Sequence, residues 1–477
     1  MGILETIDKV YGTEGDEFNK KILSKLKKDF KDFEEITGKD ILKDLEGEVE
    51  EEKDFEKAIK SFTSKLDLAK KFIEILPVYY DDSGLWWIWN KHKHKWELKD
   101  DITILNLIDE TSSADVINSK QRQEIINSLK QIGRRNKPKE IKKSWIQFKD
   151  KIIDIETGEK FDASPEYFVT NPIPHKLGSK PDTPIMDKIF EEWVGPDYVK
   201  TLYEILAYSL ISDYPIHRLF CFYGSGLNGK SCYLRLLKKF VGDENCAASE
   251  LDILLKSRFE ITRLYKKLVC QMGETNFGEL NKTSVLKKLT GQDTIGFEYK
   301  NKTPFEGFNY AKILISTNNL PPTTDKTLGF YRRWLIIDFP NQFDEKKDIL
   351  ATIPDKEYES LSLKCVNLLI DLLKKREFSN EGDIEDRIRR YEDRSDPLQK
   401  FLDENVNEDV EGHIWKGEFY KKLCGWLKEN RFREIAENTI GRRMKEKGFE
   451  QKQIYADWFN DGKGGNVRAW IGLKWKE

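Results

Sequence analysis

A glycine-rich stretch near the middle of the chain has the residue types and spacing that bind phosphate groups. Residues 224–231 read GSGLNGKS, a glycine followed by four residues and then Gly-Lys-Ser. Glycines let backbone N–H groups close around phosphate oxygens, and the N-terminus of a following helix favours the same anion. Lysine attracts the outer phosphates, and the serine hydroxyl is a ligand for Mg²⁺. The residues predicted to bind ATP and Mg²⁺ are Gly224, Gly226, Asn228, Gly229, Lys230 and Ser231.

Two polar residues downstream have the types that a nucleotide hydrolase needs beside its phosphate site. Glu274 ends an apolar run that begins at Leu268, and Asn318 ends a run that begins at Ile313. A carboxylate orients the attacking water and contributes to Mg²⁺ binding, whereas an amide senses the outer phosphate. Because parallel strands open their carboxyl ends at one sheet edge, we predict that both side chains lie beside the phosphate loop.

An arginine pair, Arg332 and Arg333, directly precedes another apolar run. Such a pair is either an ordinary surface feature or, in a ring-shaped ATPase, a finger that reaches the γ-phosphate held by the neighbouring subunit. The residues alone give these two interpretations equal weight.

The elements that must position these residues alternate between strands and helices. The apolar runs at 218–223, 268–272, 312–316 and 334–338 are typical of buried parallel strands. We predict a multidomain α/β protein with a central P-loop parallel sheet, an α-rich N-terminal region with a small β part, and a C-terminal winged helix. The predicted boundaries are a helical segment at 1–75, a small domain at 76–190, the ATPase domain at 191–345, a helical lid or linker at 346–396 and the winged helix at 397–477.

The β part of the N-terminal region has an aromatic pattern. Residues 84–90 and 95–98 contain four tryptophans and predict a hairpin. Tryptophan at such positions can stack on a base, but core packing is the favoured interpretation here.

Composition excludes some classes of protein. The net charge of the 477-residue chain is −3, so any contact with DNA must come from local basic patches. Six cysteines without a CxxC pair indicate reduced thiols and a cytoplasmic protein. The sequence has no run of 18 apolar residues and no signal peptide, so we expect no membrane partner.

The C-terminal module is predicted as three short helices and a hairpin around the turn at 461–465. The segment Lys416–Lys447 contains ten Lys and Arg residues but only five Asp and Glu residues. A winged helix would use its third helix and its wing on DNA. The candidate DNA-binding residues are Arg442, Arg443, Lys445 and, on the wing, Lys463. Because the whole module is nearly neutral, a protein-binding role is the alternative.

Together these features resemble the superfamily 3 helicases, within the AAA+ ATPases, and above all the primase-helicases of phages, plasmids and poxviruses. The likeness covers about residues 75–477. Its motifs are the compact nucleotide-binding stretch 224–333, the segment Leu286–Asp293, the sensor-like segment Ser316–Pro321, the arginine pair, the Trp-rich hairpin at 86–96 and the helical segment Leu202–Leu210.

The resemblance implies a replicative DNA helicase that assembles into a homo-oligomeric ring, expected to be a hexamer. Glu274 would be the catalytic carboxylate and Asn318 the sensor. Arg332 or Arg333 would be the finger. Residues 294–308 correspond to a hairpin that projects into the ring channel.

In that hairpin, Lys300 and Lys302 are the candidates to grip the DNA backbone. The alternative is that Lys300 and Lys302 belong to an ordinary solvent-exposed turn without a role in DNA binding. The resemblance further implies movement along single-stranded DNA in the three-prime to five-prime direction and the opening of forked DNA.

Two departures from the group stand out. Gly273 occupies the place where many members have the first of two tandem acids. About 75 residues precede the resembling region, which is too short for a primase domain. We therefore expect a helicase without primase activity, with a primase or polymerase as a separate partner. The other candidate functions are an origin-binding replication initiator and a P-loop switch or packaging motor.

Overall fold

The computed structural model describes residues 65–111, 119–273, 280, 283–300, 302–344, 348–430, 432, 434–457 and 464–476. The chain divides into two compact units. The first comprises Met1–Trp89 and Glu97–Pro138, and the second comprises Asn90–Trp96 and Lys139–Glu477. The helix predicted for residues before 65 lies outside the described residues. Within the described ranges, no helix has the length and apolar character needed to cross a membrane.

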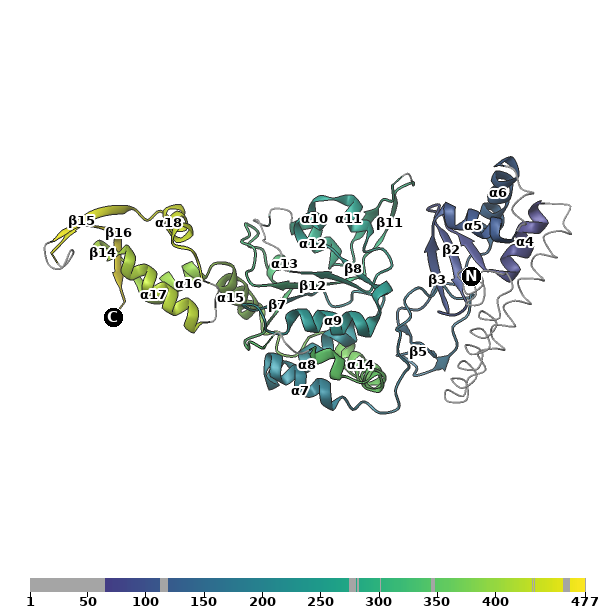
Figure 1. Ribbon diagram of the computed structural model, residues 1–477, viewed down its shortest axis with the longest axis horizontal. Helices are drawn as coiled ribbons and strands as arrows, with labels where there is room; N and C mark the ends of the chain where they lie inside the picture. The colour runs from purple at the N-terminus through teal and green to yellow at the C-terminus, as the bar shows by residue number, and fades with distance from the viewer. Residues whose placement is uncertain are drawn as a thin grey trace, which may run out of the picture. The chain divides into compact units, whose positions relative to one another are not determined.

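The first unit combines helices with a small antiparallel sheet (Figure 1). Its elements are α4 (Lys65–Ile75), β1 (Val78–Tyr80), most of β2 (Trp86–Asn90) and of β3 (Lys95–Lys99), α5 (Asp101–Thr111) and α6 (Ser119–Arg135), with the sheet order β1-β2-β3. Asn90 of β2 and the first two residues of β3 belong to the second unit. The carboxylate of Asp81 fixes the turn before β2, because it accepts hydrogen bonds from the Leu85 N–H and from Nε1 of Trp87. Strands β2 and β3 are neighbours in this sheet, so the predicted hairpin is present.

The tryptophans of this hairpin lie in the core, as predicted. Trp86, Trp87 and Trp89 are each at most 5% exposed. Nε1 of Trp86 donates to Asp101 at 2.9 Å, so the ring has a buried polar partner as well as an apolar environment. These rings are structural and are not available to stack on a base.

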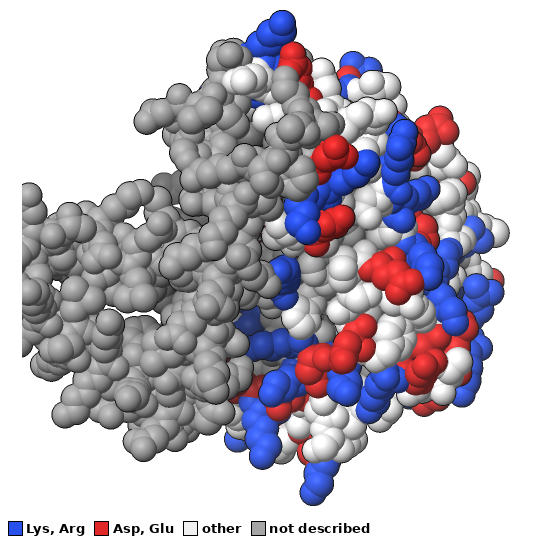
Figure 2. All heavy atoms as spheres, turned by 90° about the vertical axis from the view of Figure 1, so that its right-hand side faces the viewer, with Lys and Arg blue, Asp and Glu red and all other residues white. Residues whose placement is uncertain are grey.

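The surface charges are mixed in sign. Figure 2 shows one face on which Lys and Arg side chains lie among Asp and Glu side chains. Arg134 and Asp82, for example, form an ion pair of 2.9 Å in the first unit. On the face shown in Figure 2, opposite charges are thus interspersed.

A five-stranded parallel sheet forms the centre of the second unit, as predicted. Its strands are β7 (Leu219–Tyr223), β8 (Cys246–Ala248), β9 (Val269–Met272), β12 (Lys312–Thr317) and β13 (Trp334–Asp338), in the order β13-β7-β12-β9-β8. Four of these strands correspond to the predicted apolar runs. The short edge strand β8 was not predicted, because Cys-Ala-Ala lacks the branched and aromatic residues that signal a strand.

Helices cover both faces of this sheet (Figure 1). Alternate side chains of the strands belong to the core clusters on opposite faces. Phe220, Phe222 and Leu314 contribute to one core cluster, whereas Cys221 and Ile313 contribute to the other. The first layer consists of α7 (Pro184–Val194), α8 (Pro196–Tyr208), α9 (Lys230–Val241) and α14 (Asp355–Lys375), and the second of α10 (Leu251–Lys256), α11 (Arg258–Thr262), α12 (Thr283–Leu289), α13 (Leu328–Tyr331) and α15 (Ile384–Ser395). Burial on both faces explains why the strands are continuous apolar runs.

Smaller antiparallel elements complete the region around the sheet. They are β4 (Trp145–Gln147), β5 (Ile152–Asp154) and β6 (Lys160–Phe161) in one sheet, and the pair β10 (Thr294–Phe297) with β11 (Phe305–Phe308). Two short 3-10 helices, η1 (Asp243–Asn245) and η2 (Ile349–Thr352), follow α9 and precede α14. The fold is therefore mixed α/β, with a central parallel sheet and small antiparallel sheets.

The C-terminal part has its own apolar core. Its elements are α16 (Pro397–Asn405), β14 (Val406–Trp415), α17 (Lys416–Glu429), α18 (Glu437–Glu446), β15 (Gln451–Ala456) and β16 (Gly465–Trp475), with the sheet order β14-β16-β15. Phe419, Leu423, Ile440 and Trp470 are buried together. Strand β14 was not predicted, because its polar sequence VNEDVEGHIW has no apolar alternation. The winged-helix assignment and its role in DNA binding remain predictions.

Candidate active site

The phosphate loop connects β7 to α9 at the carboxyl edge of the central sheet. The N–H of Gly224 donates to the carbonyl oxygen of Thr317 at 3.3 Å, which joins the loop to the neighbouring strand β12. Helix α9 begins at Lys230, immediately after the loop. The first N–H groups of a helix have no partner within it, so this helix start favours an anion.

Two loop glycines are required by close packing. A Cβ atom on Gly224 would lie 1.9 Å from Nδ2 of Asn228 and 2.7 Å from the carbonyl oxygen of Phe339. A Cβ atom on Gly229, whose φ is +91°, would lie 2.5 Å from the ring of Trp193. No side chain fits at either position, so the loop keeps this tight path only with glycine. The cradle, with a helix start behind it, fits the phosphates of ATP.

Lys230 lies in a polar cluster at the same edge of the sheet. The side chain is buried, and Nζ donates to the carbonyl oxygen of Gly224 at 2.7 Å and to Oδ1 of Asn228 at 2.9 Å. It also donates to Oδ1 of Asn318 at 3.2 Å. Asn228 is itself anchored, because its Nδ2 donates to the Phe339 carbonyl at 3.1 Å. The fold thus brings the predicted phosphate lysine and the predicted sensor together.

The structure describes Gly226 and Ser231 of the predicted phosphate site, but not Glu274. Gly226 has a φ of +113°, and Ser231 is exposed at the second position of α9. Strand β9 ends at Met272 beside β12, two residues before Glu274. Glu274 lies outside the described residues, so its proposed role as catalytic carboxylate and Mg²⁺ ligand stays a prediction.

The structure separates the two arginines. Arg333 is 7% exposed, and its guanidinium donates to Oγ1 of Thr290 at 3.0 Å and to the carbonyl oxygens of Gly329 and Lys287. Burial, together with the charge of Arg332, lowers the pKa of Arg333. Arg332 is exposed. Arg333 is therefore committed to its own subunit, and only Arg332 has a side chain placed at the surface.

The arginines and the phosphate loop lie at opposite edges of the sheet. The N–H of Leu219, at the start of β7, donates to the carbonyl oxygen of Arg333 at 2.7 Å, whereas Gly224 follows the end of β7. At about 3.3 Å per residue, the five residues of β7 separate the two edges by roughly 16 Å. An arginine side chain does not span that distance, so Arg332 cannot reach the phosphate loop of its own subunit.

A cluster of polar contacts around Asp325, which was not predicted from the sequence, precedes the arginine pair in the chain. The carboxylate of Asp325 accepts hydrogen bonds from Thr283 at 2.5 Å and Thr327 at 2.6 Å, and it pairs with Lys287 at 2.6 Å. Burial alone would raise the pKa of Asp325, but these donors outweigh it and hold the pKa far below the usual range. Because α13 begins directly after Thr327, these contacts around Asp325 fix the start of the short helix that precedes Arg332.

A second unpredicted contact stands next to the phosphate loop. The guanidinium of Arg394 pairs with both carboxylate oxygens of Asp338, at 2.9 and 2.5 Å, and lies 5.5 Å from the ring centre of Tyr223. Asp338 ends β13 opposite Tyr223, the last residue of β7. This bidentate pair ties α15 to the edge that carries the phosphate loop. Arg394 is one of four arginines in 384–395, and nothing in the sequence distinguishes it from the other three.

The predicted hairpin at 294–308 is present as the antiparallel pair β10 and β11. Pairing runs from Thr294 opposite Phe308 to Phe297 opposite Phe305. Lys300 is exposed and Lys302 is half-buried near the tip. The geometry therefore presents two lysines at a hairpin end, as the hypothesis of a DNA grip requires.

Two of the three predicted DNA-binding residues of α18, Arg442 and Lys445, line a pocket of about 430 Å³. Both are exposed, and Arg443 is half-buried. Lys463 lies outside the described residues.

Comparisons with known proteins place two families along the chain. Residues 67–195 match the family described as D5 N terminal like, and residues 222–333 match the family of unknown function DUF5906. No curated protein matches the chain.

Among solved structures, three of the C-terminal region of NrS-1, all in apo form, are similar to this chain. They share 15%, 16% and 15% sequence identity with TM-scores of 0.43, 0.43 and 0.44. In each case the alignment covers 86% of this chain and 100% of the other.

Proposed function

We propose that this chain is a superfamily 3 helicase of the D5-like group, an ATP-hydrolysing motor that unwinds DNA. The observation that carries the proposal is the joint position of Lys230 and Asn318 at the end of a glycine-constrained loop. A phosphate-binding lysine held next to a sensor amide is what a nucleotide hydrolase needs to respond to its outer phosphate.

In this proposal the residues of the carboxyl edge divide the chemistry of hydrolysis among them. Lys230 and the N–H groups of the loop bind and orient the phosphates, and Asn318 orients the outer phosphate. Glu274 accepts a proton from the attacking water or orients that water. Ser231 and Glu274 would hold Mg²⁺, which supplies charge neutralisation when bound.

The position of Arg332 supports a composite site between subunits. Arg332 is exposed at the edge of the sheet opposite the phosphate loop, so as a finger it can act only on the nucleotide of another copy. This requirement favours a closed ring, for which we propose a hexamer by the family resemblance.

Contacts with DNA are assigned to two basic regions. We expect Lys300 and Lys302 to hold the backbone of single-stranded DNA in the ring channel and to move with hydrolysis, in the three-prime to five-prime direction. The C-terminal part, proposed to be a winged helix, would contact duplex DNA near the fork through Arg442 and Lys445. Its three helices and three-stranded sheet support this assignment.

The proposal is tested by ATP hydrolysis with and without single-stranded DNA, together with unwinding of a three-prime-tailed duplex. We expect hydrolysis stimulated by DNA and strand separation in the wild type, and loss of both in Lys230→Ala. A five-prime-tailed duplex is the polarity control. Hydrolysis that ignores single-stranded DNA, without unwinding, would point instead to an initiator or a switch.

A further inference from the structure

A pocket lined by basic side chains lies in the second unit, at the end of α9 that is distant from the phosphate loop. Its volume is about 790 Å³, within the usual range for small-ligand sites. It is lined by the second half of α9, by the segment Gly242–Asn245 and by residues of 172–174 and 348–351. Since Gly242 follows Lys230 by twelve residues, a helix rise of 1.5 Å per residue places the pocket roughly 18 Å from the nucleotide site.

The charge of this pocket is unlike that of the whole chain. Six basic side chains and three acidic side chains line it, although the chain as a whole has a net charge of −3. The basic residues are Lys93, Lys95, Lys149, Arg235, Lys238 and Lys239. Such a local excess of positive charge attracts anions.

The acidic residues of the pocket are held in replaceable ion pairs. Asp243 lies 3.2 Å from Lys238 and Asp348 lies 3.5 Å from Arg235, with every partner at least 45% exposed. Exposed pairs of this kind contribute little to stability, so an incoming anion can displace the carboxylates at small cost. Lys149 is exposed and makes no ion pair with another described residue.

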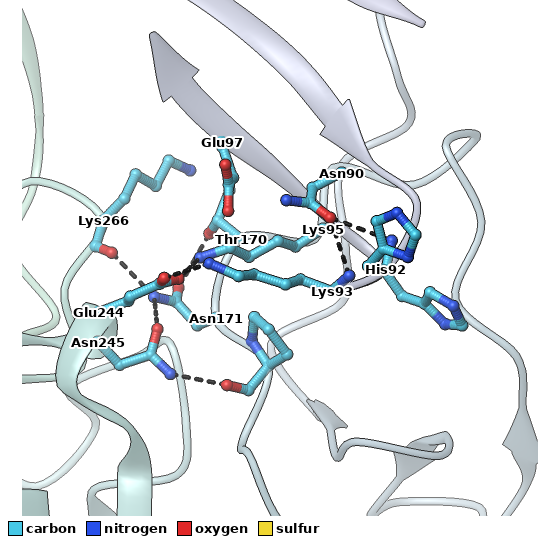
Figure 3. A network of polar contacts seen from close by, with 12 residues as sticks. Asn90, His92, Lys93, Lys95, Glu97, Thr170, Asn171, Glu244, Asn245 and Lys266 are labelled. Atoms are coloured by element: carbon cyan, nitrogen blue, oxygen red, sulfur yellow. Dashed lines mark hydrogen bonds and ion pairs between the residues drawn. The ribbon is translucent and has the colours of Figure 1, made fainter. Parts of the chain in front are cut away.

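Glu244 occupies the position between two ammonium groups. Figure 3 shows Lys93 and Lys95 extending side by side from the segment Asn90–Trp96 toward its carboxylate, and both pair with it. Hydrogen bonds from Lys93 and Lys95 lower the pKa of Glu244 to about 2. Lys93 and Lys95 therefore converge on one anionic group, the arrangement that also binds the oxygens of a phosphate.

The apolar part of the lining distinguishes between kinds of anion. Pro172, Pro174 and Ala351, each half-buried or exposed, add apolar atoms to the lining beside the basic side chains. A bare phosphate ion needs no such surface, whereas a nucleotide places its base on apolar atoms and its phosphates on cations. We propose that this pocket binds a nucleotide phosphate at a site separate from the ATP site, either as a free nucleotide or as one unit of a nucleic-acid strand.

The test uses the full-length Lys230→Ala protein, so that the phosphate loop contributes little to binding. The probes are thymidine bisphosphate as the free nucleotide and a fluorescein-labelled oligothymidylate as the strand, with affinity measured by calorimetry and by anisotropy. Lys149→Glu with Lys238→Glu should weaken binding of one or both probes about tenfold. The control is Lys374→Glu with Lys375→Glu on the exposed end of α14, which makes the same change in charge and should leave both affinities unchanged.

The two probes separate the sources of the nucleotide. Loss confined to the oligothymidylate assigns the pocket to a strand, and loss of thymidine bisphosphate binding assigns it to a free nucleotide. Affinities equal to those of the control variant overturn the proposal, as does competition by inorganic phosphate as strong as that by thymidine bisphosphate.

A second measurement avoids the Lys149→Glu and Lys238→Glu substitutions and so does not depend on whether that variant folds. Each probe in turn is added to the Lys230→Ala protein, and acetylation of lysines is followed by mass spectrometry. Protection of Lys149 and Lys238, with Lys374 still modified, supports the proposal. Equal modification of all three lysines with and without the probes overturns it. Because this readout involves no ATP hydrolysis or unwinding, its failure would leave the proposed motor untouched.

Discussion

Lys230 and Asn318 meet at the carboxyl edge of the central sheet, with Nζ of the lysine 3.2 Å from Oδ1 of the amide. The lysine is the first residue of α9, and the asparagine follows the last residue of β12. Residues 88 positions apart meet because β7, which leads into the phosphate loop, pairs directly with β12. The contact links phosphate binding to the strand that carries the sensor.

Removal of the sensor amide should impair hydrolysis more than binding. In Asn318→Ala, Lys230 retains its bonds to Gly224 and Asn228, so we expect ATP affinity to change little. Loss of a polar group that acts on the reacting phosphate should reduce kcat about 100-fold. Steady-state hydrolysis and nucleotide binding measure the two effects, with Asn319→Ala at the adjacent exposed amide as the control. An unchanged kcat in Asn318→Ala would remove this residue from the mechanism.

The two arginines should give different defects when each is replaced. Arg332→Ala should abolish hydrolysis without lowering the melting temperature, because its side chain is exposed. Arg333→Ala removes donors to Thr290, Gly329 and Lys287, and should destabilise the fold by about 2 to 4 kcal/mol. Thermal unfolding alongside hydrolysis separates these outcomes.

Mixing two inactive variants tests whether Arg332 acts between subunits. Arg332→Ala keeps an intact phosphate loop, and Lys230→Ala keeps an intact finger. A mixed ring contains interfaces with one intact element from each, so we expect the mixture to regain hydrolysis that neither variant has alone. Failure to regain activity in rings shown to be mixed would contradict a finger acting in trans.

The predictable parts of this protein were those with local signals. The phosphate loop and the four long strands were recognisable because the glycine spacing and the continuous apolar runs each reflect a local requirement. The contact of Lys230 with Asn318 was also predictable, since polar residues at the ends of parallel strands gather at one edge.

Other features depended on tertiary structure and left no local pattern. The difference between Arg332 and Arg333 comes from Thr290 and Gly329, which the fold brings to only one of the two side chains. No motif marks Asp325 in the sequence, although its carboxylate anchors the start of the helix before Arg332. The basic pocket around Glu244 joins segments about 150 residues apart, a separation at which sequence pattern carries no information.

The hairpin lysines should couple hydrolysis to movement on DNA. In Lys300→Ala with Lys302→Ala, we expect hydrolysis of ATP without DNA to persist and unwinding to fall at least about tenfold, because the backbone contacts would be lost. Unwinding and hydrolysis are measured on the same three-prime-tailed duplex. Lys374→Ala with Lys375→Ala on α14 is the charge-matched control. Unwinding at the control rate would rule out a role for this hairpin as the DNA grip.

The buried side chain of Lys312 should make the free energy of unfolding depend on pH. The side chain is fully buried at the start of β12, where Nζ donates to the carbonyl oxygens of Ile211 and Asp213 and lies 5.0 Å from the ring centre of Tyr208. Burial lowers the pKa of Lys312 from 10.5 to about 7. Between these two values the unfolded chain binds a proton that the folded chain does not, so the free energy of unfolding should rise with pH through this group.

The penalty for a charged, buried Lys312 is complete below pH 7 and is relieved progressively as the pH increases toward 10.5. Denaturant unfolding at pH 7 and pH 9 should therefore show a gain of about 1 to 3 kcal/mol in the wild type relative to Lys312→Met, in which this proton is absent. An equal pH dependence in both proteins would show that Lys312 keeps an ordinary pKa in the folded state.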